Sequence, residues 1–108
     1  MSISAEMMIA SRLIRAALDS GYLVSVWDGE DYAVVHSDDK ETIIEALGST
    51  DEDMLMFYRP GGTRKVGWVL LVWGNGEEII SDSSTDEATC KLCDEVNAWV
   101  ERQKMGVA

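Results

Sequence analysis

The segment from Val66 to Trp73 (VGWVLLVW) is apolar on both of the faces that a β-strand presents. Trp68, Leu70 and Val72 would project to one side of such a strand, and the residues between them would project to the other. An antiparallel strand that is covered on one side only usually alternates apolar with polar residues. Both sides of this strand are therefore expected to be covered, either by helices of the same chain or, on one side, by a second subunit or a partner.

Five segments of the chain have the composition of β-strands and are separated by turn residues. The turn Asp28–Asp31 contains an Asp-Gly pair and predicts a tight hairpin between the first two segments. Residues 59–65 predict a second, longer hairpin, and residues 74–76 (GNG) predict a further turn before a short last strand. The expected strands are Tyr22–Trp27, Tyr32–His36, Asp53–Tyr58, Val66–Trp73 and Glu77–Ser81.

Apolar residues recur at helical spacing in three other segments. The first helix is expected over Ser4–Asp19. Capping patterns at Asp38 and Ser84, each with a glutamate three residues later, predict a short second helix and a longer last one. Because strands joined by tight turns pair antiparallel, we predict one α+β domain over residues 1–108. Its five-stranded antiparallel sheet would follow the order α-ββ-α-βββ-α, with the helices mainly on one face.

The charge balance of the chain restricts its partners. There are 20 acidic and 9 basic residues, and the formal net charge is -11. Such a chain repels nucleic acid and anionic membrane surfaces, so we expect no direct nucleic-acid or membrane partner. The sequence contains no run of about 18 apolar residues, so we expect no membrane span. The absence of a secretory signal and the presence of only two cysteines favour a reducing, cytoplasmic location.

Motifs that could carry chemistry have simpler structural interpretations. Cys90 and Cys93 form a CxxC pair inside the last predicted helix, where both thiols would lie near its buried side. A zinc site would need two more ligands, and His36 is the only histidine. His36 ends a predicted strand beside a polar helix-capping turn, which accounts for it without catalysis. We therefore expect no enzyme activity, no cofactor and no metal site.

Acidic residues are concentrated in the middle of the sequence. Between Asp28 and Asp53 there are ten acids and one base, Lys40. One interpretation is solvation of the surface and acids favoured in the first turns of helices. The other is a surface that binds a basic groove, such as a nucleic-acid channel, in the way phosphates do. In that case the partner is a protein with a basic surface, and the expected contact residues are Glu30, Asp31, Asp51, Glu52 and Asp53.

The tip of the second hairpin carries Arg59, Arg64 and Lys65, the main basic cluster of the chain. These residues either keep the strand edges in solution or dock on an acidic patch of a partner or of a second copy. Trp68, Leu70 and Val72 form an apolar sheet face that three helices would not fully cover. A two-fold dimer is the commonest way to bury such a face, so we predict a homodimer through the sheet.

Five short motifs carry a family resemblance: SVWDGE (25–30), STDED (49–53), GWV (67–69), GNG (74–76) and ISD (80–82). Together, over about residues 10–83, they resemble small accessory proteins of unassigned activity carried by proteobacteria and their phages. The resemblance implies no site residue. By analogy of class, it favours a compact acidic inhibitor of host defence nucleases, anti-CRISPR proteins among them.

Two functions from different classes therefore stay open. The first is a non-catalytic interaction protein, an inhibitor of a nucleic-acid-processing or defence complex that acts through its acidic surface. The second is a small-ligand or regulatory module with a pocket between sheet and helices, gated by Trp27, Trp68 and Trp73.

Overall fold

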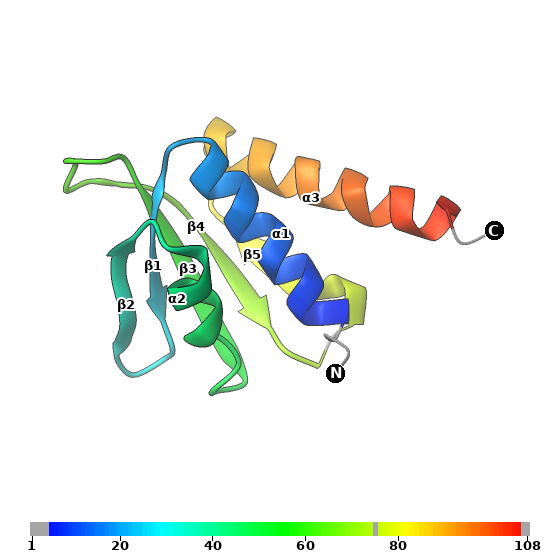
Figure 1. Cartoon of the computed structure of the whole chain (residues 1–108), viewed down its shortest axis with the longest axis horizontal. Coiled ribbons are helices and arrows are strands. Elements are labelled where there is room, and N and C mark those ends of the chain that lie inside the picture. Colours follow the sequence, from blue (N-terminus) through cyan, green and yellow to red (C-terminus); the bar gives the residue numbers. More distant parts are fainter. Residues whose placement is uncertain (1–4, 75, 107–108) are drawn as a thin grey trace.

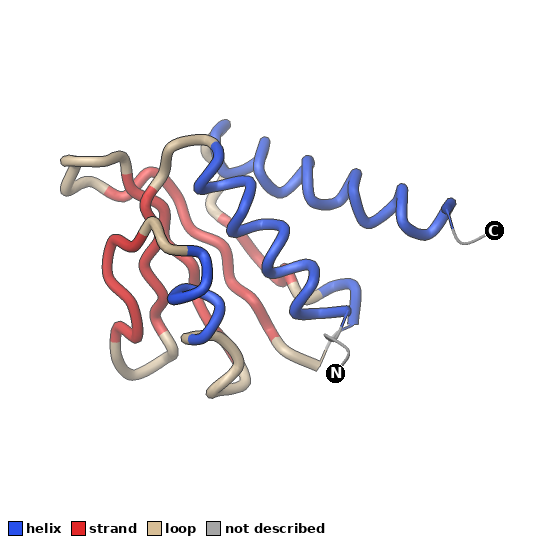
Figure 2. Tube along the Cα trace, in the orientation of Figure 1, coloured by secondary structure: helices blue, strands red, loops and turns tan. Residues whose placement is uncertain are grey.

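The computed structural model describes residues 5–74 and 76–106. Within them, three α-helices and one 3-10 helix accompany a single five-stranded antiparallel sheet with the strand order β2-β1-β3-β4-β5 (Figures 1 and 2). The predicted α+β class and element order are confirmed. The elements are α1 (Ala5–Asp19), β1 (Leu23–Trp27), β2 (Tyr32–Ser37), α2 (Lys40–Glu45), β3 (Glu52–Tyr58), β4 (Lys65–Val72), η1 (Gly76–Glu78), β5 (Ile80–Ser83) and α3 (Glu87–Gly106).

The core lies between the sheet and a layer formed by all three α-helices (Figure 1). The side of α1 that faces the sheet is apolar, as its spacing predicted, and Leu13, Ile14 and Ala17 have no exposed surface. Helices α2 and α3 contribute buried apolar side chains to the same cluster. We call the side of the sheet that contacts them the inner face, and its buried side chains are Val24, Val26, Leu55, Phe57, Val69 and Leu71.

Strand alternation divides β4 between the two faces of the sheet. Val69 and Leu71 are fully buried under the helices, whereas Trp68, Leu70 and Val72 project from the opposite side and are half-buried. The described helices cover the inner face only. We call the other side the outer face; besides those three residues it carries Trp27, Met54, Met56 and Tyr58.

Two helix starts differ from the predicted caps by one or two residues. The N-cap of α2 is Asp39 rather than Asp38, and its side chain accepts a hydrogen bond from the Glu41 amide at 3.1 Å. At the start of α3, Asp86 accepts from the Thr89 amide at 2.9 Å. Ser84 instead accepts a bond from the Trp68 amide of β4, so its hydroxyl joins the sheet to the helix.

The last strand begins later in the chain than the sequence indicated. Gly76–Glu78 forms the 3-10 helix η1, and β5 starts only at Ile80. Ile79, between η1 and β5, is fully buried in the core, and its burial holds the segment that joins these two elements in place. Asn75, part of the predicted turn, lies outside the described residues.

Candidate functional site

Two acidic loops meet at one end of the sheet. The β1–β2 turn and the loop before β3 are joined by Thr50, whose single hydroxyl hydrogen is shared between the carbonyl oxygens of Asp28 at 2.9 Å and Glu52 at 2.7 Å. The sequence predicted that acids from both loops would be displayed together, and the structure brings most of them together there. We call this surface the acidic end, and it consists of Asp28, Glu30, Asp31, Asp51 and Glu52.

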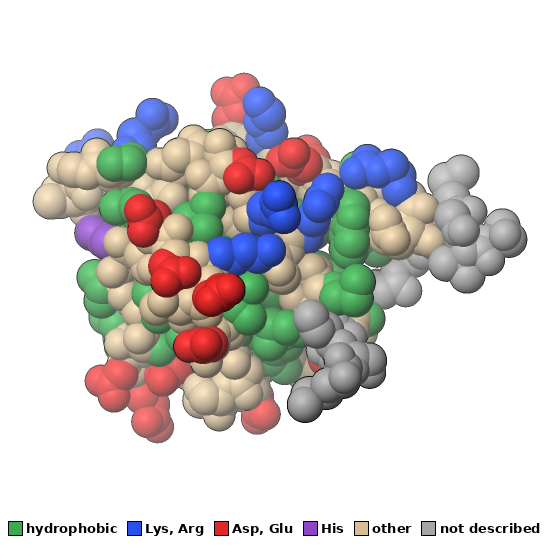
Figure 3. All heavy atoms as spheres, viewed as in Figure 1, with side chains coloured by type: hydrophobic (Ala, Val, Ile, Leu, Met, Phe, Trp, Pro, Cys, Tyr) green, Lys and Arg blue, Asp and Glu red, His purple; other side chains and the backbone are tan. Residues whose placement is uncertain are grey.

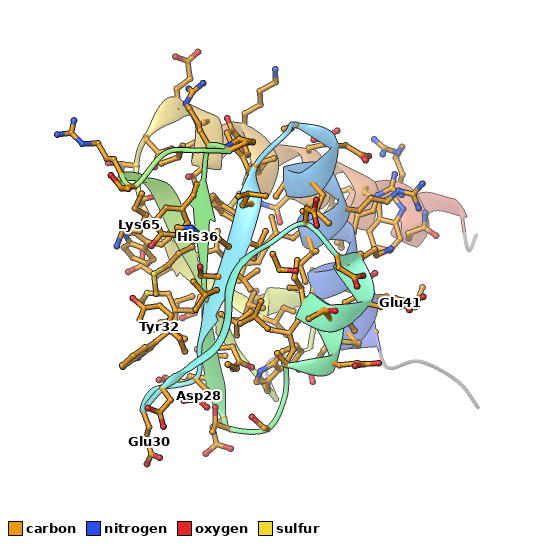
Figure 4. The ribbon with its side chains drawn as sticks, turned by 60° about the vertical axis from the view of Figure 1, so that its left-hand side comes forward. Asp28, Glu30, Tyr32, His36, Glu41 and Lys65 are labelled. Carbon is orange, nitrogen blue, oxygen red and sulfur yellow. The ribbon has the colours of Figure 1, made fainter. Side chains whose placement is uncertain are left out.

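The β1–β2 turn is held by the carboxylate of Asp28. Asp28 Oδ1 accepts hydrogen bonds from the amides of Asp31 and Glu30, each at 2.9 Å, and these bonds lower the pKa of Asp28. Gly29 follows with φ +103°, a conformation that side chains disfavour. These contacts hold the turn, from which Glu30 extends (Figure 4), and both Glu30 and Asp31 are exposed.

Asp53 does not belong to the acidic end, and its prediction as a contact residue is wrong. It has no exposed surface, because it lies on the inner face of β3 in line with Leu55 and Phe57. Its Oδ2 accepts from the Gly48 amide and from Trp73 Nε1, both at 2.8 Å. Burial raises the pKa of Asp53, and these two hydrogen bonds oppose that rise.

The raised pKa of Asp53 predicts how stability responds to pH. A carboxyl group with a higher pKa in the folded state adds stability below its unfolded pKa and loses that contribution as pH rises through the folded value. Asp53→Asn cannot titrate. The free energy of unfolding of the wild type, minus that of the variant, should therefore increase as pH falls from neutral towards the ordinary pKa of 3.8.

Urea unfolding of both proteins at a series of pH values measures this difference, and the contributions of the other acids cancel in it. A difference that is constant or that shrinks on acidification would show that Asp53 is not held in a charge-disfavouring site.

The acidic end has uncompensated charge. None of its five carboxylates lies within 4.0 Å of a described lysine or arginine nitrogen. A shallow depression runs between the two loops, lined by Asp28, Gly29, Glu30, Thr50, Asp51, Glu52 and Val72. Among residues 5–74 and 76–106, no group of three or more His, Cys, Asp or Glu side chains is arranged to hold a metal ion. The surface is suited to a cationic protein group, which meets an open negative potential there.

The histidine and the cysteines lie away from this end. His36 occupies the left-handed region with φ 47°, and its ring centroid lies 4.1 Å from that of Tyr58. Cys93 lies on the buried side of α3, and burial raises the pKa of its thiol, which disfavours the reactive thiolate.

A hollow on the helix side was missed by the sequence reasoning. It lies between the helices rather than between sheet and helices, where large buried side chains fill the interior. Arg12 Cζ lies 5.4 Å from the Trp99 ring centroid at its wall. In Figure 3, lysine and arginine side chains gather over this side next to hydrophobic ones. The sequence pattern that could have indicated this hollow lies on α1, where Met8, Ser11, Arg12 and Arg15 share one helical face.

Comparisons with protein-family models, with curated proteins and with solved structures give no match to this chain. No helix in the described part of the chain is long and apolar enough to span a bilayer. Functional inference therefore rests on the geometry and charge of the surfaces.

Proposed function

We propose that this chain is a non-catalytic binding protein that docks its acidic end on a basic surface of a protein partner. The proposed partner class is a nucleic-acid-processing complex, whose basic groove ordinarily accepts phosphates. One observation supports this most: five carboxylates from two separate loops are displayed at one end of the sheet and have no described counter-ion within ion-pairing distance. A partner's lysines and arginines would supply the missing charge.

The rigidity of the loops supports the same proposal. The Thr50 bridge and the Asp28 turn fix the backbone before any partner arrives. Preorganised carboxylates lose little conformational entropy on binding, so the binding free energy is more favourable. Binding should also weaken as salt is added, because screening acts on exposed charges.

The test compares two variants of equal charge. The first, E30Q/D31N/D51N/E52Q, neutralises four of the five carboxylates of the acidic end and leaves Asp28 to hold its turn. The second, E41Q/E45Q/D94N/E95Q, removes four exposed acids from α2 and α3. Affinity is measured for a basic partner captured from nuclease-treated bacterial lysate and then purified. The first variant should bind at least about tenfold more weakly, or about 1.4 kcal/mol, with a flatter salt dependence.

The matched variant should stay within about twofold of the wild type, because its four substituted acids lie on α2 and α3 and outside the acidic end. Added double-stranded DNA or RNA should displace the wild-type protein from its partner. Equal losses in both variants would mean that only net charge matters, and an undiminished affinity of the first variant would exclude the acidic end as the docking site.

A further inference from the structure

The outer face of the sheet is mainly apolar and has no described helix over it, although Ser25 lies beside Met56 and the exposed Asp82 of β5 lies beside Leu70. Met56 pairs with Trp68 and Met54 pairs with Leu70 across β3 and β4. Trp27 of β1 lies opposite Met54 and carries this surface towards the edge strand β2. The Tyr32 hydroxyl and the Tyr58 hydroxyl each lie 3.9 Å from Met56 Sδ, so the ring-bearing side chains enclose that sulfur.

Part of this surface is strongly exposed at its edge. Tyr32 keeps 51% of its surface exposed, and its ring packs edge-on against Trp27 at 4.9 Å between centroids. Trp68, Leu70 and Val72 are each half-buried rather than enclosed. An apolar sheet face that keeps this partial exposure is a candidate interaction surface.

The outer face also has opposite charges at its two ends. The β3–β4 hairpin places Arg59, Arg64 and Lys65 at one end, whereas the acidic end lies at the other. Figure 4 shows Lys65 and His36 towards one end of this side, Tyr32 between, and Asp28 and Glu30 at the far end. The seven residues of β3 span roughly 20 Å. This exceeds the screening length of about 8 Å at physiological salt, so each end presents its own charge to another molecule.

We propose that the outer face binds a second copy of this chain, face to face, about a two-fold axis perpendicular to the strands. In this arrangement the strands of the two copies run in opposite directions. The basic hairpin tip of each copy then lies over the acidic end of the other, and the apolar middle is buried between two sheets packed about 10 Å apart. A two-fold axis parallel to the strands would place acid on acid and base on base.

Electrostatics decides the orientation, and apolar burial supplies the attraction. The net charge of -11 on each chain opposes association at long range. Screening weakens this repulsion at physiological salt and leaves the apolar contribution and the close charge contacts in place. The same complementarity favours a second copy over an arbitrary apolar partner, since both charged ends are satisfied at once.

The dimer does not rest on the proposed function. In the dimer, the three cations of each hairpin tip cover the acidic end of the other copy, so a basic partner would compete with the second copy for that surface. The dimer is measured on the purified chain alone, and its failure would leave the partner experiment unaffected.

The test is the mass in solution by light scattering with sedimentation equilibrium, at tens of micromolar protein and physiological salt. The wild type should have twice the chain mass of 11.9 kDa. Leu70→Glu, which places a charge in the middle of the face, should give the monomer mass with an unchanged circular dichroism spectrum. If that variant does not fold, Tyr32→Glu on the exposed edge replaces it. Met8→Glu, at a side chain 45% exposed on α1, is the control and should stay dimeric.

A charge exchange within one chain tests the orientation. R59E/R64E/K65E places acid over acid and should raise the dissociation constant at least tenfold. Adding E30K/D51K/E52K to it should restore the dimer, because the two ends are again opposite in charge. Adding E41K/E45K/E95K instead gives the same net charge on the helix side and should not restore it. A wild-type mass near 11.9 kDa, or a dimer unaffected by both Leu70→Glu and Tyr32→Glu, overturns the proposal. Restoration by the helix-side set overturns the orientation.

Discussion

Gly67→Ala should destabilise the protein by about 3 kcal/mol, at the upper end of the range for overpacked cores. Gly67 is buried in β4 beneath the start of α3. A Cβ at this position would overlap Thr89 Oγ1 and would lie only 2.6 Å from Asp86 Oδ1 and 2.7 Å from Ser84 Oγ. Asp86 caps the helix and Ser84 joins it to the sheet, so these two side chains cannot move without loss of hydrogen bonds, and the Thr89 hydroxyl is itself buried among them. Urea unfolding measures the change.

A double-mutant cycle identifies the cause of that loss. Thr89→Ala removes the hydroxyl that the new methyl group would meet, so the cost of Gly67→Ala should fall by about 1 kcal/mol in the double variant. Additive losses would mean that the glycine is required for a reason other than contact with Thr89. Gly29→Ala serves as a contrast, since its Cβ meets nothing within 4 Å and its cost comes from φ alone.

Phe57→Ala should cost about 3–5 kcal/mol, a large share of the 5–15 kcal/mol that stabilises a typical domain. Phe57 is a fully buried side chain on the inner face of β3, and its ring lies 6.5 Å from that of Tyr22. Truncation leaves a cavity where strand and helix layer meet. Because β3 runs from the acidic end to the basic hairpin tip, its loosening disturbs both charged surfaces.

Phe57→Leu fills most of the cavity and should cost less than half as much as the alanine variant. Thermal and urea unfolding of the two variants give the comparison. Equal losses would mean that the aromatic ring itself, rather than the volume it fills, stabilises this position.

The acidic end was largely predictable, because turn chemistry is local. The Asp-Gly pair gives a tight turn wherever strands flank it, and turn positions expose their side chains. Glu52 differs from Asp53 in strand register, and Asp51 lies in the loop before β3 begins. The signal for Asp53 was present, since it stands two residues before Leu55 and four before Phe57, and strand side chains two apart share a face.

The sequence by itself determined the three α-helices, the antiparallel pairing within the hairpins and the exposure of the turn acids. Each of these depends on residues within a few positions of one another, whereas the 3-10 helix η1 and the pairing of β1 with β3 do not follow from local pattern. The tertiary structure fixed which side of β4 meets the helices, since both sides are apolar, and it leaves Trp68, Leu70 and Val72 on the uncovered side, as expected. It also decided the burial of Asp53, whose partner Trp73 is 20 residues away, and the joining of two loops by Thr50 and Asp28, 22 residues apart. Such contacts form only when the whole sheet is assembled, since strand pairing brings distant residues together.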